Sequence, residues 1–156
     1  METEPICPII FDNTLLGNNF IRFDVQGEPF AKQRPRATKK GRYITVYTPR
    51  ETKNYEKKVE NSYKEIYNNF QLKGSLSAKI EGTFSIPKSI SKKLQKEMEL
   101  GNVHHTKKPD ADNMGKICLD GLNGIAYQDD SQIESLLITK KYGKEAKVTI
   151  TIIEQE

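Results

Sequence analysis

The stretch "KKPDADNMGKICLDGLNGIAYQDDSQI", residues 107–133, combines a strong helix signal with two pairs of aspartates. Asn123 and Gly124 form a typical helix stop signal, and Asp112 or Asn113 is suited to cap the first turn. One side of the intervening segment is apolar at helical spacing: Met114, Ile117, Cys118 and Leu122. The stretch therefore predicts a helix that packs on a core and has acidic residues at both ends.

Alternating apolar residues on either side of this stretch predict strands. "FIRFDVQGEP" (residues 20–29) alternates Ile21, Phe23 and Val25, and "SAKIEGTFSIP" (77–87) alternates Ala78, Ile80, Gly82, Phe84 and Ile86. "SQIESLLITKKYG" (131–143) and "AKVTITIIE" (146–154) are expected to form two strands joined as a hairpin by a turn at Gly143.

Two further helices are expected. The first extends over residues 52–70, and one of its faces is apolar: Tyr55, Val59, Tyr63, Ile66 and Phe70. The second lies in "SISKKLQKEMELGN" (89–102), with Ser91 as N-cap and Gly101 after its end. Helices and strands mix without strict alternation, which favours a single α+β domain in which helices pack on a mixed β-sheet.

Length and composition suit one domain: the chain has 156 residues, of which 35% are hydrophobic and 29% are charged. No apolar run reaches the roughly 18 residues of a membrane span, and the acidic start "METEPICPII" differs from a secretory signal. Cys7 and Cys118 are too few for a disulfide scaffold or a four-cysteine zinc site. We expect a cytoplasmic protein with a loosely packed or disordered extension over residues 1–17 and one domain over residues 18–156.

The two aspartate pairs are where the sequence indicates chemistry. Taken alone, "PDADN" is typical of a loop followed by a helix cap, and the Asp129–Asp130 pair is typical of a polar turn. If the loop over residues 124–127 turns back along the helix, Asp130 comes to lie beside Asp110 and Asp112. Three converging carboxylates repel one another unless a cation compensates, so this arrangement predicts a hard divalent ion such as Mg²⁺ or Mn²⁺.

Basic residues complete the pattern. Lys116 lies four residues after Asp112 and four before Asp120, so it forms surface ion pairs or faces a phosphate beside the metal. The segment "KQRPRATKKGR" (32–42) has six basic residues and no acidic one, and Pro35 and Gly41 suggest a loop without regular structure. Such a loop either increases solubility or contacts a nucleic-acid backbone.

Residues 108–133 resemble the signature of the RusA family of Holliday-junction resolvases, in which a Pro-Asp-x-Asp-Asn element precedes a helical lysine and a later Asp-Asp-x-Gln. "GEPFAKQRPRAT" (27–38), "YTP" (47–49) and "FSIPKSISKKL" (84–94) are similar to other family segments. The resemblance covers the chain from about Phe20 to Ile153.

This resemblance implies a RusA-like fold and a bacterial or phage-encoded, metal-dependent endonuclease that acts as a homodimer on four-way DNA junctions. Two nicks in opposed strands need two sites related by a two-fold axis. A water bound to the metal is expected to attack the scissile phosphate in line. The implied metal ligands are Asp110, Asp112 and Asp130, the implied catalytic lysine is Lys116, and Asp120 and Asp129 are secondary candidates. The DNA-backbone contacts expected from the basic residues are Lys32, Arg34 and Arg36, followed by Lys107 and Lys108.

Two alternatives stay open from the sequence. One is a junction-binding protein whose acidic cluster is structural, and the other is a metal nuclease that prefers a flap, a fork or a single strand. The adjacent His104 and His105 are either ordinary surface residues or residues that assist the site. The motif encodes the reaction but not the geometry of the substrate.

Overall fold

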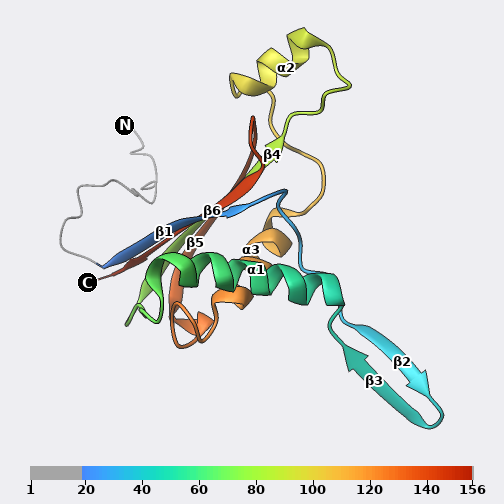
Figure 1. Ribbon diagram of the computed structural model, residues 1–156, viewed down its shortest axis with the longest axis vertical. Helices are drawn as coiled ribbons and strands as arrows, with labels where there is room; N and C mark the ends of the chain where they lie inside the picture. The colour runs from blue at the N-terminus through green and yellow to red at the C-terminus, as the bar shows by residue number, and fades with distance from the viewer. Residues whose placement is uncertain (1–18, 156) are drawn as a thin grey trace, which may run out of the picture.

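The computed structural model describes residues 19–155, so the extension predicted over residues 1–17 lies outside the described residues. Figure 1 shows an elongated molecule built around one sheet. The strands of this sheet are β1 (Phe20–Gln26), β4 (Leu76–Ser85), β5 (Ile133–Gly143) and β6 (Lys147–Glu154). The helices are α1 (Arg50–Tyr67), α2 (Lys92–Glu99) and α3 (Ala111–Leu122).

The four strands lie in the order β1-β6-β4-β5. β6 is antiparallel to β1 and β4, and β4 is parallel to β5. Parallel neighbours need a long crossover connection, and here α2 and α3 lie in that crossover between β4 and β5. The mixed sheet with helices confirms the predicted α+β class.

The alternation in the strands places the core as predicted. Ile21 and Val25 of β1 are fully buried, and Ala78 and Ile80 of β4 are also fully buried. β6 lies between β1 and β4, so both of its edges are paired, and its apolar residues Val148, Ile150 and Ile152 meet the same core. Helices α1 and α3 pack against each other, α1 beside β1 and α3 beside β4 and β5, so this core lies between them and the sheet.

Helix α1 follows the predicted face for three turns and then departs from it. Tyr55, Val59 and Tyr63 are buried, but Ile66 and Phe70 are 59% and 41% exposed. Tyr67 continues the buried face instead: its ring stacks on Tyr63 at 5.2 Å, and its hydroxyl accepts a hydrogen bond from the backbone N–H of Arg22 at 2.9 Å. The helix ends at this contact with β1, so the placement of Ile66 and Phe70 on the buried face was wrong.

Helices α2 and α3 stop where the sequence predicts. The side chain of Ser91 accepts a hydrogen bond from the backbone N–H of Leu94, so it caps α2, and Gly101 after the helix has φ 79°. Asn123 follows α3, and Gly124 has φ 74°, a conformation that favours glycine.

Two glycines let α3 approach its neighbours closely. A Cβ atom at Gly115 would lie 2.3 Å from Cδ1 of Ile138 on β5. A Cβ atom at Gly121 would lie 2.9 Å from the carbonyl oxygen of Glu56 on α1. Gly115 therefore costs intrinsic helix stability but allows α3 to seat against the sheet.

The hairpin predicted from the last two strands is wrong. β5 and β6 follow each other in the chain, but β4 lies between them and pairs with both. The connection over residues 144–146 crosses the end of β4, where a Cβ atom at Gly143 would lie 2.5 Å from Cγ2 of Thr83. Gly143 was correctly identified as the break, but the sequence gives no sign that a third strand separates its neighbours.

The basic segment is a hairpin and not an irregular loop. β2 (Arg36–Lys40) and β3 (Tyr43–Tyr47) pair antiparallel and form an arm that projects from the body (Figure 1). Gly41 has φ 63° in the two-residue turn between the strands, where glycine is favoured, and Pro35 precedes the first strand. Pro35 and Gly41 therefore bound and turn the arm, so the prediction of a loop without regular structure was wrong.

No helix within residues 19–155 is long and apolar enough to cross a membrane. Cys118 is buried in the core as a free thiol, as expected for a small core residue. Burial raises the pKa of its thiol to about 12. Cys7 lies outside the described range.

Candidate functional site

Asp110 and Asp112 stand at the exposed beginning of α3. Asp110 is the N-cap residue in an extended conformation, with φ −66° and ψ 142°, and its carbonyl accepts a hydrogen bond from the backbone N–H of Met114 at 3.0 Å. Its side chain makes no capping hydrogen bond. The helix thus begins one residue after Asp110, and the expectation that Asp112 or Asn113 caps it was wrong.

A shallow concavity lies beside Asp110. It has a volume of about 430 Å³ and is lined by residues that follow β1 and residues around the start of α3: Pro29, Phe30, Ala31, Gln33, Lys108, Pro109, Asp110 and Asn113. A hydrogen bond from the backbone N–H of Lys32 to the carbonyl oxygen of Asn113, at 3.1 Å, holds the two segments together. The carboxylate of Asp110 is therefore at the rim of a surface depression that a ligand can enter.

Lys140 on β5 holds the loop that leads to this site. Its Nζ donates hydrogen bonds to the carbonyl oxygens of Lys107, at 2.7 Å, and Pro109, at 2.9 Å. Lys107 and Lys108, which the sequence offered as DNA contacts, are exposed on the same loop. Lys140 therefore positions the backbone beside Asp110. The sequence did not predict this role, because Lys140 lies in β5, 31 positions after Pro109 in the chain.

Lys116 and Asp120 differ in their surroundings. Asp120 forms an ion pair with Lys32, whereas Lys116 is exposed and has no ion-pair partner among residues 19–155. The predicted helical spacing is correct, but the chain coming from β1 supplies the cation that neutralises Asp120. Lys32 is therefore engaged in an ion pair with Asp120, whereas Lys116 is exposed to solvent one helical turn after Asp112.

Asp129 has a structural role. Its carboxylate accepts hydrogen bonds from the hydroxyl of Ser131 and from the backbone N–H of Ser131, and its own N–H donates to Gln132 at 3.0 Å. These contacts cap the single 3₁₀ turn Asp130–Gln132, and the bonds from Ser131 keep the pKa of Asp129 below its usual value. Asp130 is exposed and has no hydrogen-bond partner for its side chain in the described part of the chain.

Asp130 does not join Asp110 and Asp112 within one protomer. Tyr127, whose hydroxyl donates to the carbonyl oxygen of Leu119 at 2.6 Å, lies at the same end of α3 as Asp130. Burial raises the pKa of this tyrosine, and the charge of Asp130 raises it further. Among the described residues, no three His, Cys, Asp or Glu side chains lie close enough together to hold a metal ion.

The path of β5 explains this separation. β5 begins at Ile133, three residues after Asp130, and passes about seven residues, or roughly 23 Å at ~3.3 Å per residue, before Lys140 reaches Pro109. The loop over residues 124–127 turns the chain into β5 and does not return it to the start of α3. The predicted convergence of the three carboxylates was therefore wrong for a single protomer.

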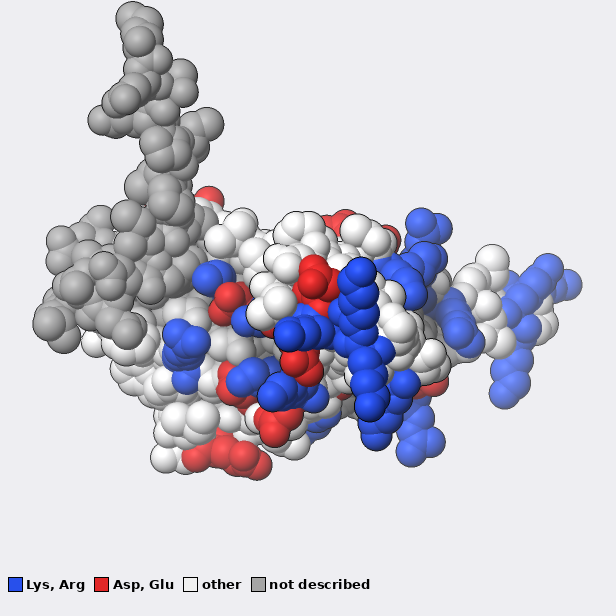
Figure 2. Space-filling model, turned by 90° about the horizontal axis from the view of Figure 1, so that it is seen from above, with Lys and Arg blue, Asp and Glu red and all other residues white. Residues whose placement is uncertain are grey.

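All charged residues of the arm formed by β2 and β3 are basic. Arg34 and Arg36, both predicted DNA contacts, are exposed, as are Lys39, Lys40 and Arg42. In Figure 2 the arm projects from the body with basic and neutral atoms along it. Lys32, the third predicted contact, lies at its base and pairs with Asp120.

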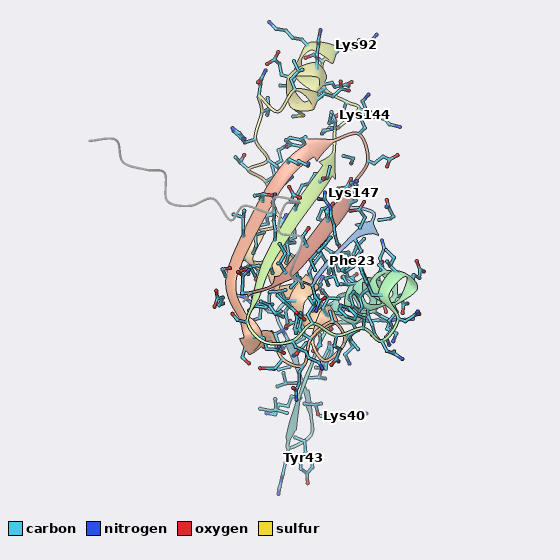
Figure 3. The ribbon with its side chains drawn as sticks, turned by 90° about the vertical axis from the view of Figure 1, so that its left-hand side faces the viewer. Phe23, Lys40, Tyr43, Lys92, Lys144 and Lys147 are labelled. Carbon is cyan, nitrogen blue, oxygen red and sulfur yellow. The ribbon has the colours of Figure 1, made fainter. Side chains whose placement is uncertain are left out.

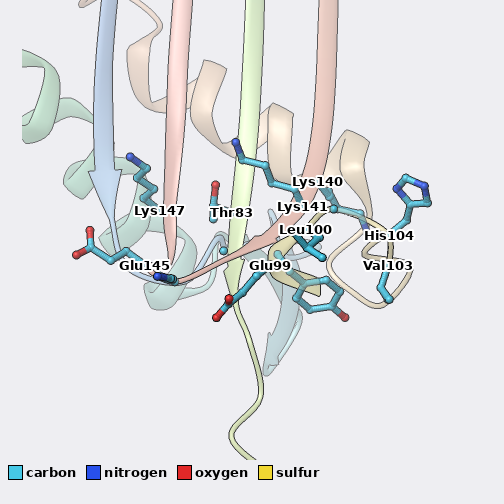
Figure 4. A pocket seen from close by; sticks show the side chains of 13 residues that line it. Thr83, Glu99, Leu100, Val103, His104, Lys140, Lys141, Glu145 and Lys147 are labelled. Atoms are coloured by element: carbon cyan, nitrogen blue, oxygen red, sulfur yellow. The ribbon is translucent and has the colours of Figure 1, made fainter. Parts of the chain in front are cut away.

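A second basic surface lies at the opposite end of the molecule, near α2. A concavity with a volume of about 580 Å³ lies where the connection from β5 to β6 crosses β4, and Figure 4 shows the side chains that line it. Two glutamates, Glu99 and Glu145, and one histidine, His104, also line it. Its lysines belong to the run "KKYGKEAK" (140–147), for which the sequence predicted only strand and turn. They are Lys140, Lys141, Lys144 and Lys147.

His105 is a buried residue that helps to fix the loop before Asp110. Its ring stacks on Phe84 at 3.7 Å and lies 5.0 Å from the ring of Tyr142, and its Nδ1 is buried without a partner in the described range. Burial lowers the pKa of His105, and the nearby charge of Lys140 lowers it further. His104, in contrast, is exposed.

The lowered pKa of His105 predicts that acid destabilises this loop. Above about pH 7 the imidazole is neutral in both states, but as the pH falls below its unfolded value of about 6.5 the unfolded chain binds a proton and the folded protein does not. The free energy of unfolding should therefore decrease between about pH 7 and pH 5. Urea unfolding at several pH values should show a smaller decrease for His105→Phe than for the original protein.

His104→Gln is the matched control, because His104 is the other histidine of the chain and is exposed. This variant should keep the full pH dependence. An unchanged slope in His105→Phe would contradict the assignment to His105.

Comparison with known proteins identifies the family of this chain. The family model of endodeoxyribonuclease RusA matches residues 26–153. The chain is also 33% identical over 136 residues to the uncharacterized protein YqaN of Bacillus subtilis (strain 168), a match that covers 86% of this chain and 96% of YqaN. Because the family match covers most of the chain, including β4, β5, α3 and both aspartate pairs, we conclude that the chain belongs to the RusA family of endodeoxyribonucleases.

Proposed function

We propose that this protein is a metal-dependent endonuclease that resolves four-way DNA junctions by paired, symmetric nicks, as a homodimer, in DNA recombination and repair. The observation that carries the proposal is the state of Asp110 and Asp112. Both are exposed at the start of α3, and neither forms an ion pair or a side-chain hydrogen bond within residues 19–155. Carboxylates left unengaged beside a surface concavity are available to a ligand.

The donor set fits a hard divalent cation. Carboxylate oxygens suit Mg²⁺ or Mn²⁺, and Asp110, Asp112 and Asp130 are the residues that would hold the ion. Asp120 and Asp129 are not included among these ligands, because Asp120 forms an ion pair with Lys32 and Asp129 caps a turn. A bound metal would lower the pKa of a water ligand and polarise the scissile phosphate.

Lys116 is suited to stabilise the phosphate during cleavage. It is exposed one helical turn after Asp112, and no carboxylate in the described residues neutralises it. A cation held beside the reacting phosphate offsets the negative charge that grows on its oxygens. The exposed lysines Lys107 and Lys108 on the preceding loop add positive charge that can hold the DNA backbone beside the site.

The separation of Asp130 from Asp110 supports a dimeric site. One protomer offers two unengaged carboxylates at the start of α3, and within the described residues Asp130 does not form a three-carboxylate cluster with them. A second copy related by a two-fold axis can supply its Asp130 to this place while receiving the same residue in return. Such an exchange gives two equivalent sites, as paired nicks require.

The test of this function is cleavage of labelled DNA. The purified protein should nick opposed strands of a synthetic four-way junction symmetrically with Mg²⁺ or Mn²⁺ and should lose this activity in EDTA. A matched linear duplex, a flap and a fork show whether the substrate is the junction or another branched form. Tight junction binding without cleavage under either metal would contradict the proposal.

A further inference from the structure

The arm formed by β2 and β3 has two chemically different faces. Its register pairs Arg36 with Tyr47, Thr38 with Thr45 and Lys40 with Tyr43 on one face, because side chains alternate along a strand. The other face carries the pairs Ala37 with Val46 and Lys39 with Ile44. The first face, here called the tyrosine face, therefore places two aromatic rings directly opposite two cations.

These rings are not part of the core. Tyr43 is 81% exposed and Tyr47 is 43% exposed, and every residue of both strands is exposed. Figure 3 shows Lys40 and Tyr43 at the tip of the arm, at the end of the molecule opposite Lys92. An isolated two-stranded hairpin is marginally stable in water, so large exposed rings on such an arm point to a partner that covers them.

The positive charge of the arm indicates that this partner is a polyanion. From Lys32 to Arg50 the chain has seven basic residues and no acidic one. Arginine and lysine beside aromatic rings are the combination by which proteins hold nucleic-acid backbones and stack on bases. A protein partner would need an acidic surface, and an acidic surface would leave the rings without flat apolar groups to cover them.

The spacing of the rings distinguishes between forms of DNA. Tyr43 and Tyr47 are four residues apart on one strand, or about 14 Å at ~3.4 Å per residue, so they cannot sandwich one base or stack on two adjacent bases. In an intact duplex the faces of the bases are already stacked on their neighbours. Ring faces become available at a branch point, where strands exchange and stacking is interrupted.

We infer that the tyrosine face of the arm enters the branch point of a DNA junction, where Tyr43 and Tyr47 stack on two separate exposed bases while Arg36 and Lys40 bind the flanking phosphates. This inference rests on the proposed function and deepens it. The arm then supplies the preference for branched DNA, whereas the aspartates at the start of α3 supply cleavage.

The experiment measures binding and base stacking without cleavage. The protein in EDTA is titrated into a four-way junction with 2-aminopurine at the branch point, and its fluorescence and the affinity are compared with those for a linear duplex. The original protein should decrease the fluorescence of the junction, because a tyrosine ring that stacks on 2-aminopurine quenches it. Tyr43→Ala/Tyr47→Ala should abolish this decrease and weaken junction binding about tenfold or more, with less than about a twofold change for the duplex.

Three matched variants make the result specific. Tyr43→Phe/Tyr47→Phe keeps both rings and should behave as the original protein. Ile44→Thr/Val46→Thr alters the opposite face and should also behave as the original. Tyr43→Val/Tyr47→Val keeps the preference for strand structure but removes the rings, so it should match the alanine variant if stacking is the cause.

The inference is overturned if the alanine and valine variants keep the junction affinity and the fluorescence change, or if they weaken junction and duplex equally. Its failure is distinct from failure of the proposed function, because no step of this measurement depends on a metal or on cleavage. A protein that perturbs the branch point but never cuts would keep the inference and refute the nuclease.

Discussion

Asp112→Asn should reduce the rate of junction cleavage by about 10³-fold or more while junction affinity stays within about threefold. The substitution removes one negative charge from a side chain that has no protein partner within residues 19–155, so the fold loses no contact. Loss of a metal ligand removes several kcal/mol of stabilisation from the transition state, and each 1.36 kcal/mol corresponds to tenfold in rate. Single-turnover cleavage with excess protein measures this effect separately from binding.

Asp129→Asn is the informative control for Asp112→Asn. Asp129 is also acidic and exposed, but its carboxylate caps the turn Asp130–Gln132, and asparagine is a comparable capping residue. It should retain cleavage within about tenfold. A cleavage rate for Asp112→Asn close to that of the original protein would remove Asp112 from the proposed metal site.

A mixture of two inactive variants should recover activity if the sites are shared between protomers. In a dimer of one Asp112→Asn protomer and one Asp130→Asn protomer, a shared arrangement places both substitutions in one site and leaves the other site intact. Such a dimer should nick one strand at a rate within about tenfold of the original, against a loss of about 10³-fold for either variant alone. Denaturing gels of the DNA cleaved by the mixed dimer show whether one strand or two opposed strands of a junction have been nicked.

The opposite result is equally clear. If each protomer built its own complete site, each protomer of the mixed dimer would carry one damaged site and no recovery would occur. Co-expression with two different affinity tags isolates the mixed dimer and excludes failure to exchange as an explanation. Size measurement by light scattering on the same sample should give twice the mass of the 17.8 kDa chain.

Most individual elements were predictable because their signals are local. Strands β1 and β4, the N-cap Ser91, and the end of α3 at Asn123 and Gly124 follow from alternation, capping and stop signals within a few residues. The candidate site was predictable in part for the same reason. The exposed positions of Asp110, Asp112 and Lys116 follow from where one amphipathic helix begins and which side of it is apolar.

The errors concern relations between distant parts of the chain. Nothing within residues 131–154 indicates that β4 separates β5 from β6, because a strand carries the same alternation whichever neighbour it has. The path of Asp130 depends on where β5 starts, and the role of Lys32 depends on how the chain after β1 meets α3. The arm was missed because Pro35 and Gly41 bound and turn strands as readily as they interrupt them.

The position of β6 sets an order of events for newly made protein. β6 is the last strand of the described chain, yet it lies inside the sheet, and it is the neighbour with which β1 pairs, as in the match of Phe20 with Ile153. These partners are separated by more than 130 positions, and pairings across such long separations slow folding. During synthesis β1 therefore has no strand to pair with until β6, which ends at Glu154, has been made. The sheet on which α3 is seated is therefore completed only after residue 154 has been synthesised, so the candidate site at the start of α3 gains its full support late in folding.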